Sequence, residues 1–193
     1  MRSIVLWLVE KEVKHNLISE AEKRLYEYGY TIFFNTVINL FVIMLIAILC
    51  NALEYIVFFS VMFIPLRSYA GGWHADKVWK CILLTNFTIF LLILIQENII
   101  VNNPIAMIIG GGICASYIFY VSPVQNKYRI LNLPEKKRYK RNSRIILTIQ
   151  FISFMVLIIF HNYFIAQIIL YELVIIAISL FVEKMDEYIL IED

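Results

Sequence analysis

Three long stretches of the chain carry no formal charge, and they constrain its fold more than any other feature. They comprise 26 residues after Glu27, 29 after Glu97 and 27 after Arg144. Each is longer than the roughly 20 apolar residues with which a helix crosses the ~30 Å hydrocarbon core of a bilayer. The composition agrees, because 61% of the 193 residues are hydrophobic and 17% are charged. These figures exclude a water-soluble enzyme and predict an all-α, polytopic integral membrane protein.

Shorter uncharged stretches add further candidate spans. Residues 55–66 and 81–96 flank a polar segment, and another apolar run reaches Val182. We therefore expect about six transmembrane helices, at 31–50, 52–66, 82–96, 104–122, 145–160 and 164–182. The second and third are short, so four full spans with a re-entrant pair are an alternative.

This division predicts three parts of the chain. An N-terminal amphipathic segment, 1–30, precedes a single transmembrane domain, 31–182, and an acidic C-terminal tail, 183–193, follows it. The transmembrane domain contains the polar segment 67–81 and a basic loop, 123–144.

The first 30 residues have the pattern of an amphipathic helix. Apolar residues recur every four positions from Val5 to Leu25, with charged residues between them. Such a helix lies in the membrane interface or packs on the chain's own membrane domain, and the pattern favours neither. The early apolar run, 4–9, is shorter than a signal-peptide core, so we expect no removable targeting segment.

The basic residues predict the orientation in the membrane. Of 17 Lys and Arg residues, five lie in 1–30, three in 67–80, eight in 123–144 and one at Lys184. The connections at 51, 97–103 and 161–163 contain none. Because Lys- and Arg-rich loops stay in the cytoplasm, both termini and the polar segment are expected there, with either number of spans.

The polar segment is the one place where a histidine and a cysteine lie close in the sequence. It reads Arg67-Ser-Tyr-Ala-Gly-Gly-Trp-His-Ala-Asp-Lys-Val-Trp-Lys-Cys81. A nucleophilic cysteine needs a base or a nearby positive charge, because the thiolate is the attacking form. His74 can supply the base, and Lys80 or Lys77 can supply the charge.

This pair requires a bend in the backbone. In one straight helix, His74 and Cys81 would share a face but lie about 10.5 Å apart along the axis, too far for a hydrogen bond. Gly71 and Gly72 provide permissive backbone, and Arg67 is a natural clamp for a carboxylate or carbonyl.

Two other interpretations of the pair are a metal site and two unrelated residues at the membrane interface. No second histidine or cysteine lies nearby to complete a tetrahedral zinc site, so we expect no metal and no other cofactor. Cys50 and Cys114 lie in or near apolar spans, where a thiol behaves as a small hydrophobic group, and three cysteines form no even disulfide framework.

The stretch from Arg67 through His74, with Cys81 seven residues after the histidine, resembles the accessory gene regulator B (AgrB) family of bacterial membrane cysteine endopeptidases. The resemblance extends over nearly the whole chain, including the amphipathic N-terminus and the Ser122-Pro123 entry to a basic stretch. One visible departure is Trp73, where the family has a tyrosine or a small residue. That position is not catalytic, so the departure bears on substrate preference and not on the assignment.

The resemblance implies a function as well as a fold. His74 and Cys81 would be catalytic, and they would cleave the C-terminal part of a short, AgrD-like quorum-sensing propeptide at the inner face of the bacterial cytoplasmic membrane. The Cys81 thioester would then be opened by a cysteine or serine of the propeptide, which closes a thiolactone or lactone ring. The resemblance also implies a homodimer in the lipid bilayer, and no nucleic-acid partner is expected.

Roles for the remaining residues stay open. Arg67, Gly71 and Gly72 fall on the family motif and either position substrate or serve as a cytoplasmic anchor and a turn, while Lys80 would shape the site through its charge. Glu172 lies mid-span, where a charge costs about 3 kcal/mol on insertion scales. It is either a polar contact in the peptide path or subunit interface, or a protonated or hydrogen-bonded carboxyl within the bundle.

Two other classes of protein share this composition. A peptide transporter or exporter without protease activity fits poorly, because no inverted repeat and no matching pair of broken helices is visible. A non-enzymatic membrane scaffold would leave the polar segment 67–81 without a purpose.

Overall fold

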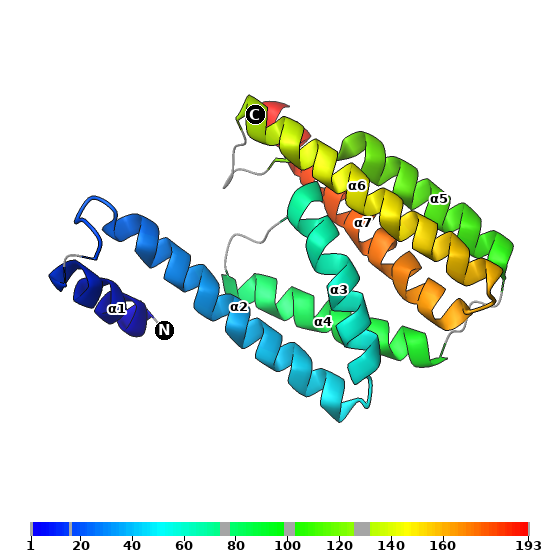
Figure 1. Ribbon diagram of the computed structural model, residues 1–193, viewed down its shortest axis with the longest axis horizontal. Coiled ribbons are helices and arrows are strands. Elements are labelled where there is room, and N and C mark those ends of the chain that lie inside the picture. The colour runs from blue at the N-terminus through cyan, green and yellow to red at the C-terminus, as the bar shows by residue number, and fades with distance from the viewer. Residues whose placement is uncertain (1, 16, 74–77, 99–102, 126–131, 193) are drawn as a thin grey trace.

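The computed structural model describes residues 2–15, 17–73, 78–98, 103–125 and 132–192 (Figure 1). These residues form seven α-helices and no strand, so the predicted all-α class is confirmed. The helices are α1 (Arg2–Lys14), α2 (Lys23–Leu49), α3 (Leu53–Ala70), α4 (Val78–Asn98), α5 (Pro104–Val121), α6 (Leu133–Ile159) and α7 (Tyr163–Glu192).

Within the described residues, five helices are long and apolar enough to cross a membrane: α2, α3, α5, α6, and α7 as far as Asp186. The remaining expected span, 82–96, corresponds to a shorter apolar stretch of α4, Ile82–Gln96. The helix α3 continues past the expected end at Leu66 to Ala70, which makes it 18 residues long. At 1.5 Å per residue this is about 27 Å, close to the thickness of the hydrocarbon core.

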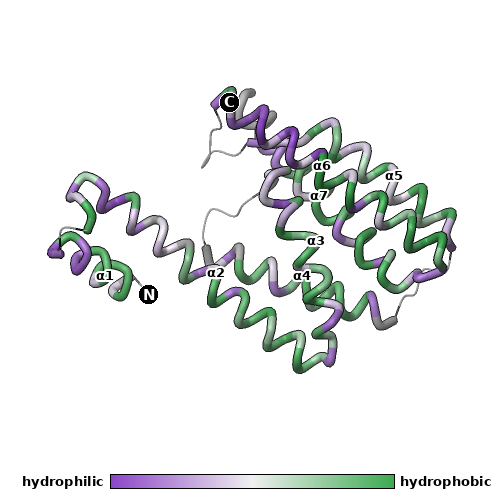
Figure 2. Tube along the Cα trace, viewed as in Figure 1, coloured by the Kyte–Doolittle hydropathy of each residue, from purple (hydrophilic) through white to green (hydrophobic). Residues whose placement is uncertain are grey.

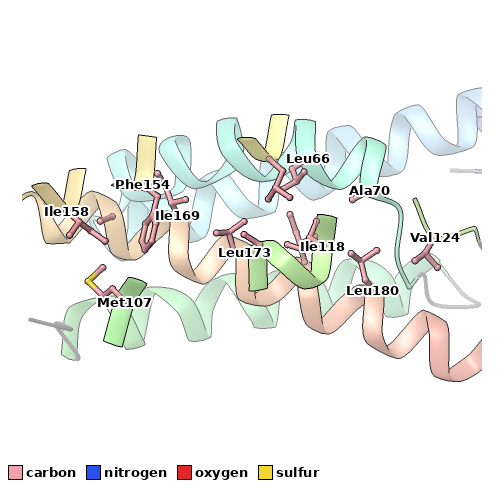
Figure 3. Close-up of a cluster of buried hydrophobic side chains, with 14 residues drawn as sticks. Leu66, Ala70, Met107, Ile118, Val124, Phe154, Ile158, Ile169, Leu173 and Leu180 are labelled. Atoms are coloured by element: carbon pink, nitrogen blue, oxygen red, sulfur yellow. The ribbon is translucent and has the colours of Figure 1, made fainter. Parts of the chain in front are cut away.

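The helices pack around two apolar clusters that share α3 and α7. The larger cluster joins α3, α5, α6 and α7, and Figure 3 shows Leu66, Phe154 and Leu173 pointing into it. The second joins α2, α3, α4 and α7 through side chains such as Phe59, Ile93 and Ile168. Because α3 and α7 contribute side chains to both clusters, these two helices hold the bundle together.

The segment expected as a basic loop is partly helical. Asn132 accepts a hydrogen bond from the Glu135 amide at 2.9 Å, and the Glu135 carboxylate accepts one from the Asn132 amide at 3.2 Å. This capping box, with Pro134 beside it, starts α6 at Leu133. Six of the eight basic residues therefore lie on the first turns of α6, where Figure 2 shows a hydrophilic helix end.

The N-terminal residues do not form one helix through Leu25, because α1 ends at Lys14 and α2 begins at Lys23. Val5 and Val9 of α1 are buried against side chains that include Phe34 of α2. The structure therefore favours the alternative in which this helix packs on the chain's own membrane domain.

At the opposite end of the chain, residues 183–192 continue α7. The segment expected as an acidic tail thus begins as a helical extension of the last span.

Candidate functional site

The expected bend lies at the end of α3. The helix stops at Ala70, and Gly71 and Gly72 follow with φ of 79° and 121°, a backbone region that favours glycine. The Val124 amide donates a hydrogen bond to the Ala70 carbonyl at 2.9 Å, and Gly71 pairs with Val124 in an isolated parallel bridge. The bend therefore occurs where the sequence predicts it, and it is held against the segment that follows α5.

Arg67 clamps this bend. Its guanidinium donates a hydrogen bond from Nη1 to the Gly71 carbonyl and another from Nη2 to the Trp73 carbonyl, the latter at 2.6 Å. A planar guanidinium is suited to two acceptors at once, and a charged donor strengthens each bond. Arg67 thus binds two carbonyls of its own chain, and a role in positioning substrate stays a prediction.

Gly72 lets α3 and α7 come close together at this point. A Cβ atom added there would collide with Nη1 of Arg67 and would lie 2.8 Å from Oγ of Ser179 in α7. At Gly71, an added Cβ would collide with the Val124 carbonyl oxygen. Both glycines are needed for the close approach as well as for the backbone angles.

Trp73 connects the bend to α7. Its amide donates to the Ser179 carbonyl at 3.1 Å, and its indole Nε1 donates to the Asp186 carboxylate at 2.9 Å. Ser179 and Asp186 were not expected at this site, because no pattern in the sequence relates them to the polar segment. Asp186 lies 113 positions after Trp73, so only the tertiary structure brings them together.

Other residues from the stretches that resemble the family also lie at this end of the bundle. Ser122, directly after α5, shares a buried 2.8 Å hydrogen bond between hydroxyl oxygens with Ser143 of α6. Tyr69 of α3 packs edge-on against Tyr139, with ring centroids 5.4 Å apart. The ends of α3, α5 and α7 and the beginning of α6 therefore meet (Figure 1).

The expected catalytic pair is only partly covered by the described residues. His74 lies outside them, directly after Trp73, whereas Cys81 is the fourth residue of α4. Lys80 precedes it on an exposed part of this helix, with its Nζ 5.8 Å from the centroid of the Trp79 ring. The pairing of His74 with Cys81 stays a prediction.

Glu172 lies away from this end, two helical turns before Ser179 on α7. It is fully buried, and its Oε1 accepts a hydrogen bond from Gln150 at 3.0 Å. This contact supports the interpretation of a hydrogen-bonded carboxyl within the bundle. Among the residues described, no three His, Cys, Asp or Glu side chains are grouped as metal ligands.

Comparison with known proteins gives one match. A family model described as accessory gene regulator B matches residues 1–180, nearly the whole chain. No curated protein and no solved structure matches the chain.

Proposed function

The chain belongs to the accessory gene regulator B family, and from this membership we propose that it is a membrane cysteine endopeptidase that matures a quorum-sensing propeptide. The match over residues 1–180 is the observation that carries the proposal, because it includes the whole polar segment, the helices α1 to α6 and the part of α7 up to residue 180. The family supports the coarser conclusion of a role in quorum-sensing propeptide processing at the membrane.

The proposed first step is acyl transfer to Cys81. His74 takes the proton of the Cys81 thiol, and the thiolate attacks the carbonyl carbon at the cleavage site. The peptide C–N bond breaks, the C-terminal fragment leaves as an amine that receives the proton from His74, and the remaining propeptide stays bound as a thioester.

The second step closes the ring and restores the enzyme. A cysteine thiol or serine hydroxyl within the propeptide attacks the thioester carbonyl, which forms the thiolactone or lactone and returns the thiol of Cys81. Exchange of one thioester for another is nearly balanced in energy, so cyclisation must outrun hydrolysis through proximity and exclusion of water. A site at the membrane boundary favours both.

Co-expression with the cognate propeptide tests this mechanism. Cleavage should be lost in Cys81→Ala and in His74→Ala. The matched controls are Cys50→Ala and Cys114→Ala, which remove the other two cysteines and should retain cleavage. Cleavage that survives Cys81→Ala contradicts the mechanism.

We also propose that the protein is a homodimer, as its resemblance to the family implies. Mixing Cys81→Ala protomers with His74→Ala protomers tests whether one subunit completes the dyad of the other. Restored cleavage requires a dyad shared across subunits, and absent cleavage confines the dyad to one protomer.

We also propose that this end of the bundle and both termini face the cytoplasm. The meeting of the ends of α3, α5 and α7 with the basic start of α6 supports it, because it gathers basic segments at one end. In a Cys50→Ala/Cys114→Ala background, a membrane-impermeant maleimide applied to intact cells should label Asn51→Cys but not Lys184→Cys. Labelling at position 184 contradicts this orientation.

A further inference from the structure

We propose that Trp73 and Asp186 form a positioning pair that orients the chain entering His74, which makes the helical extension of α7 a support of the active site. This inference rests on the proposed function, in which His74 is the catalytic base. Neither Trp73 nor Asp186 touches the reacting atoms, and each acts through the backbone that precedes His74.

The hydrogen bonds of Trp73 carry the inference. Its amide N–H is bonded to Ser179, its carbonyl to Arg67, and its indole N–H to Asp186, at 3.1, 2.6 and 2.9 Å. Every polar group of the residue is thus used, and the partners come from α3 and α7. The backbone of Trp73 is thus held by both helices directly before the segment that contains His74.

The indole contact is the one that depends on residue type. Any amino acid except proline could donate its backbone amide to Ser179, but a side-chain N–H that reaches Asp186 requires tryptophan or a comparably long donor. The bond to a carboxylate is charge-assisted, and it ties the bend to α7.

The helix α7 extends beyond its apolar part, and Asp186 lies in this extension. Glu183 and Lys184 mark the end of the apolar run, yet the helix continues through Glu192. Asp186 accepts the hydrogen bond of the Trp73 indole at 2.9 Å. Without the extension, Trp73 would keep only its two backbone contacts.

Alkylation of Cys81 by iodoacetamide tests the inference without a propeptide. In a Cys50→Ala/Cys114→Ala background, Cys81 is the single thiol, and its alkylation rate near neutral pH reports how effectively His74 generates the thiolate. His74→Ala should lower this rate. Trp73→Phe keeps an aromatic ring but removes the indole N–H. This variant and Asp186→Ala should each lower the alkylation rate by roughly tenfold, because the base His74 would be misplaced.

Conservative and control variants separate positioning from general damage. Asp186→Asn keeps an acceptor oxygen and should recover the rate to within about twofold. Trp7→Phe makes the same substitution at an exposed tryptophan of α1 and should leave the rate unchanged. Because Trp73 and Asp186 share one hydrogen bond, the double variant should be no slower than either single variant.

Propeptide cleavage provides a second readout. Trp73→Phe and Asp186→Ala should lower kcat by roughly tenfold with little change in KM, since a positioning defect acts on the chemical step.

The outcomes distinguish the two proposals. If His74→Ala abolishes cleavage but Trp73→Phe and Asp186→Ala alkylate and cleave at the wild-type rate, this inference is wrong and the proposed function stands. If Cys81 is alkylated as slowly in Asp186→Asn as in Asp186→Ala, the hydrogen bond between Trp73 and Asp186 does not cause the slower alkylation. The same conclusion follows if the rate loss of the double variant is the product of the losses of the two single variants. If His74→Ala changes neither alkylation nor cleavage, the proposed function itself fails.

Discussion

Gln150 of α6 and Glu172 of α7 are hydrogen-bonded to each other inside the bundle, with 3.0 Å between Nε2 and Oε1. The same Nε2 donates to the Met62 carbonyl of α3 at 2.7 Å, so one amide joins three helices. Gln150 therefore donates to two acceptors, one on α3 and one on α7.

This relationship predicts that Glu172 is structural. Glu172→Gln keeps an acceptor for Gln150 and should retain processing to within about twofold, with no loss of stability. Gln150→Leu leaves both acceptors without this donor and should lower the free energy of unfolding by about 1–3 kcal/mol. Thermal unfolding in detergent and propeptide cleavage measure the two effects. A Glu172→Gln variant that folds normally but does not process would assign Glu172 to the peptide path.

Arg67 should not be replaceable by lysine. A single ammonium on a flexible stem does not reproduce the two guanidinium bonds that hold the Gly71 and Trp73 carbonyls. Arg67→Ala should reduce propeptide cleavage by roughly 100-fold and Arg67→Lys by roughly tenfold, as expected when a supporting group displaces the site. Cleavage rates at equal membrane expression are the measurement. Full activity in Arg67→Lys would show that only the positive charge matters.

Gly72 should tolerate no Cβ atom. Its φ of 121° and the proximity of Arg67 and Ser179 predict that Gly72→Ala lowers stability by about 1–3 kcal/mol and impairs cleavage. Gly112 of α5 is the matched control, since an added Cβ there meets nothing within 4 Å. Gly112→Ala should be neutral or stabilising by up to about 1 kcal/mol. Equal effects of the two substitutions on the thermal midpoint would contradict the packing at Gly72.

The docking of α1 on α2 predicts a difference between two faces of α1. Val9 is 0% exposed, whereas Ile4 is 56% exposed. Val9→Asn buries an amide without a partner and should weaken docking by about 1–3 kcal/mol, while Ile4→Asn should change it by less than about 0.5 kcal/mol. Protease cleavage of the connection between α1 and α2, measured in native membranes, reports the undocking. Faster cleavage in Ile4→Asn alone would reverse the assignment of the two faces.

The turn after α3 could be predicted because its determinants are local. The bend at Gly71-Gly72 follows from backbone freedom, and the clamp at Arg67 follows from the chemistry of a guanidinium four residues earlier. The partners Ser179 and Asp186 could not be predicted in this way. They depend on the rotation and height at which α7 meets α3, and no spacing in the sequence encodes that register.

The sequence by itself determined that the chain spans a membrane several times and where the basic residues lie between the apolar segments. The physical reason is the large cost of placing charges and unpaired backbone groups in hydrocarbon, which no single tertiary contact offsets. Only the tertiary structure decided which side of each helix faces protein. Lipid tails and a protein interior are equally apolar, so hydropathy does not distinguish Phe41, which is 70% exposed, from Phe154, which is 0% exposed. The hydrogen bond between Trp73 and Asp186 could not be predicted from the sequence either, because it forms only when α3 and α7 pack together.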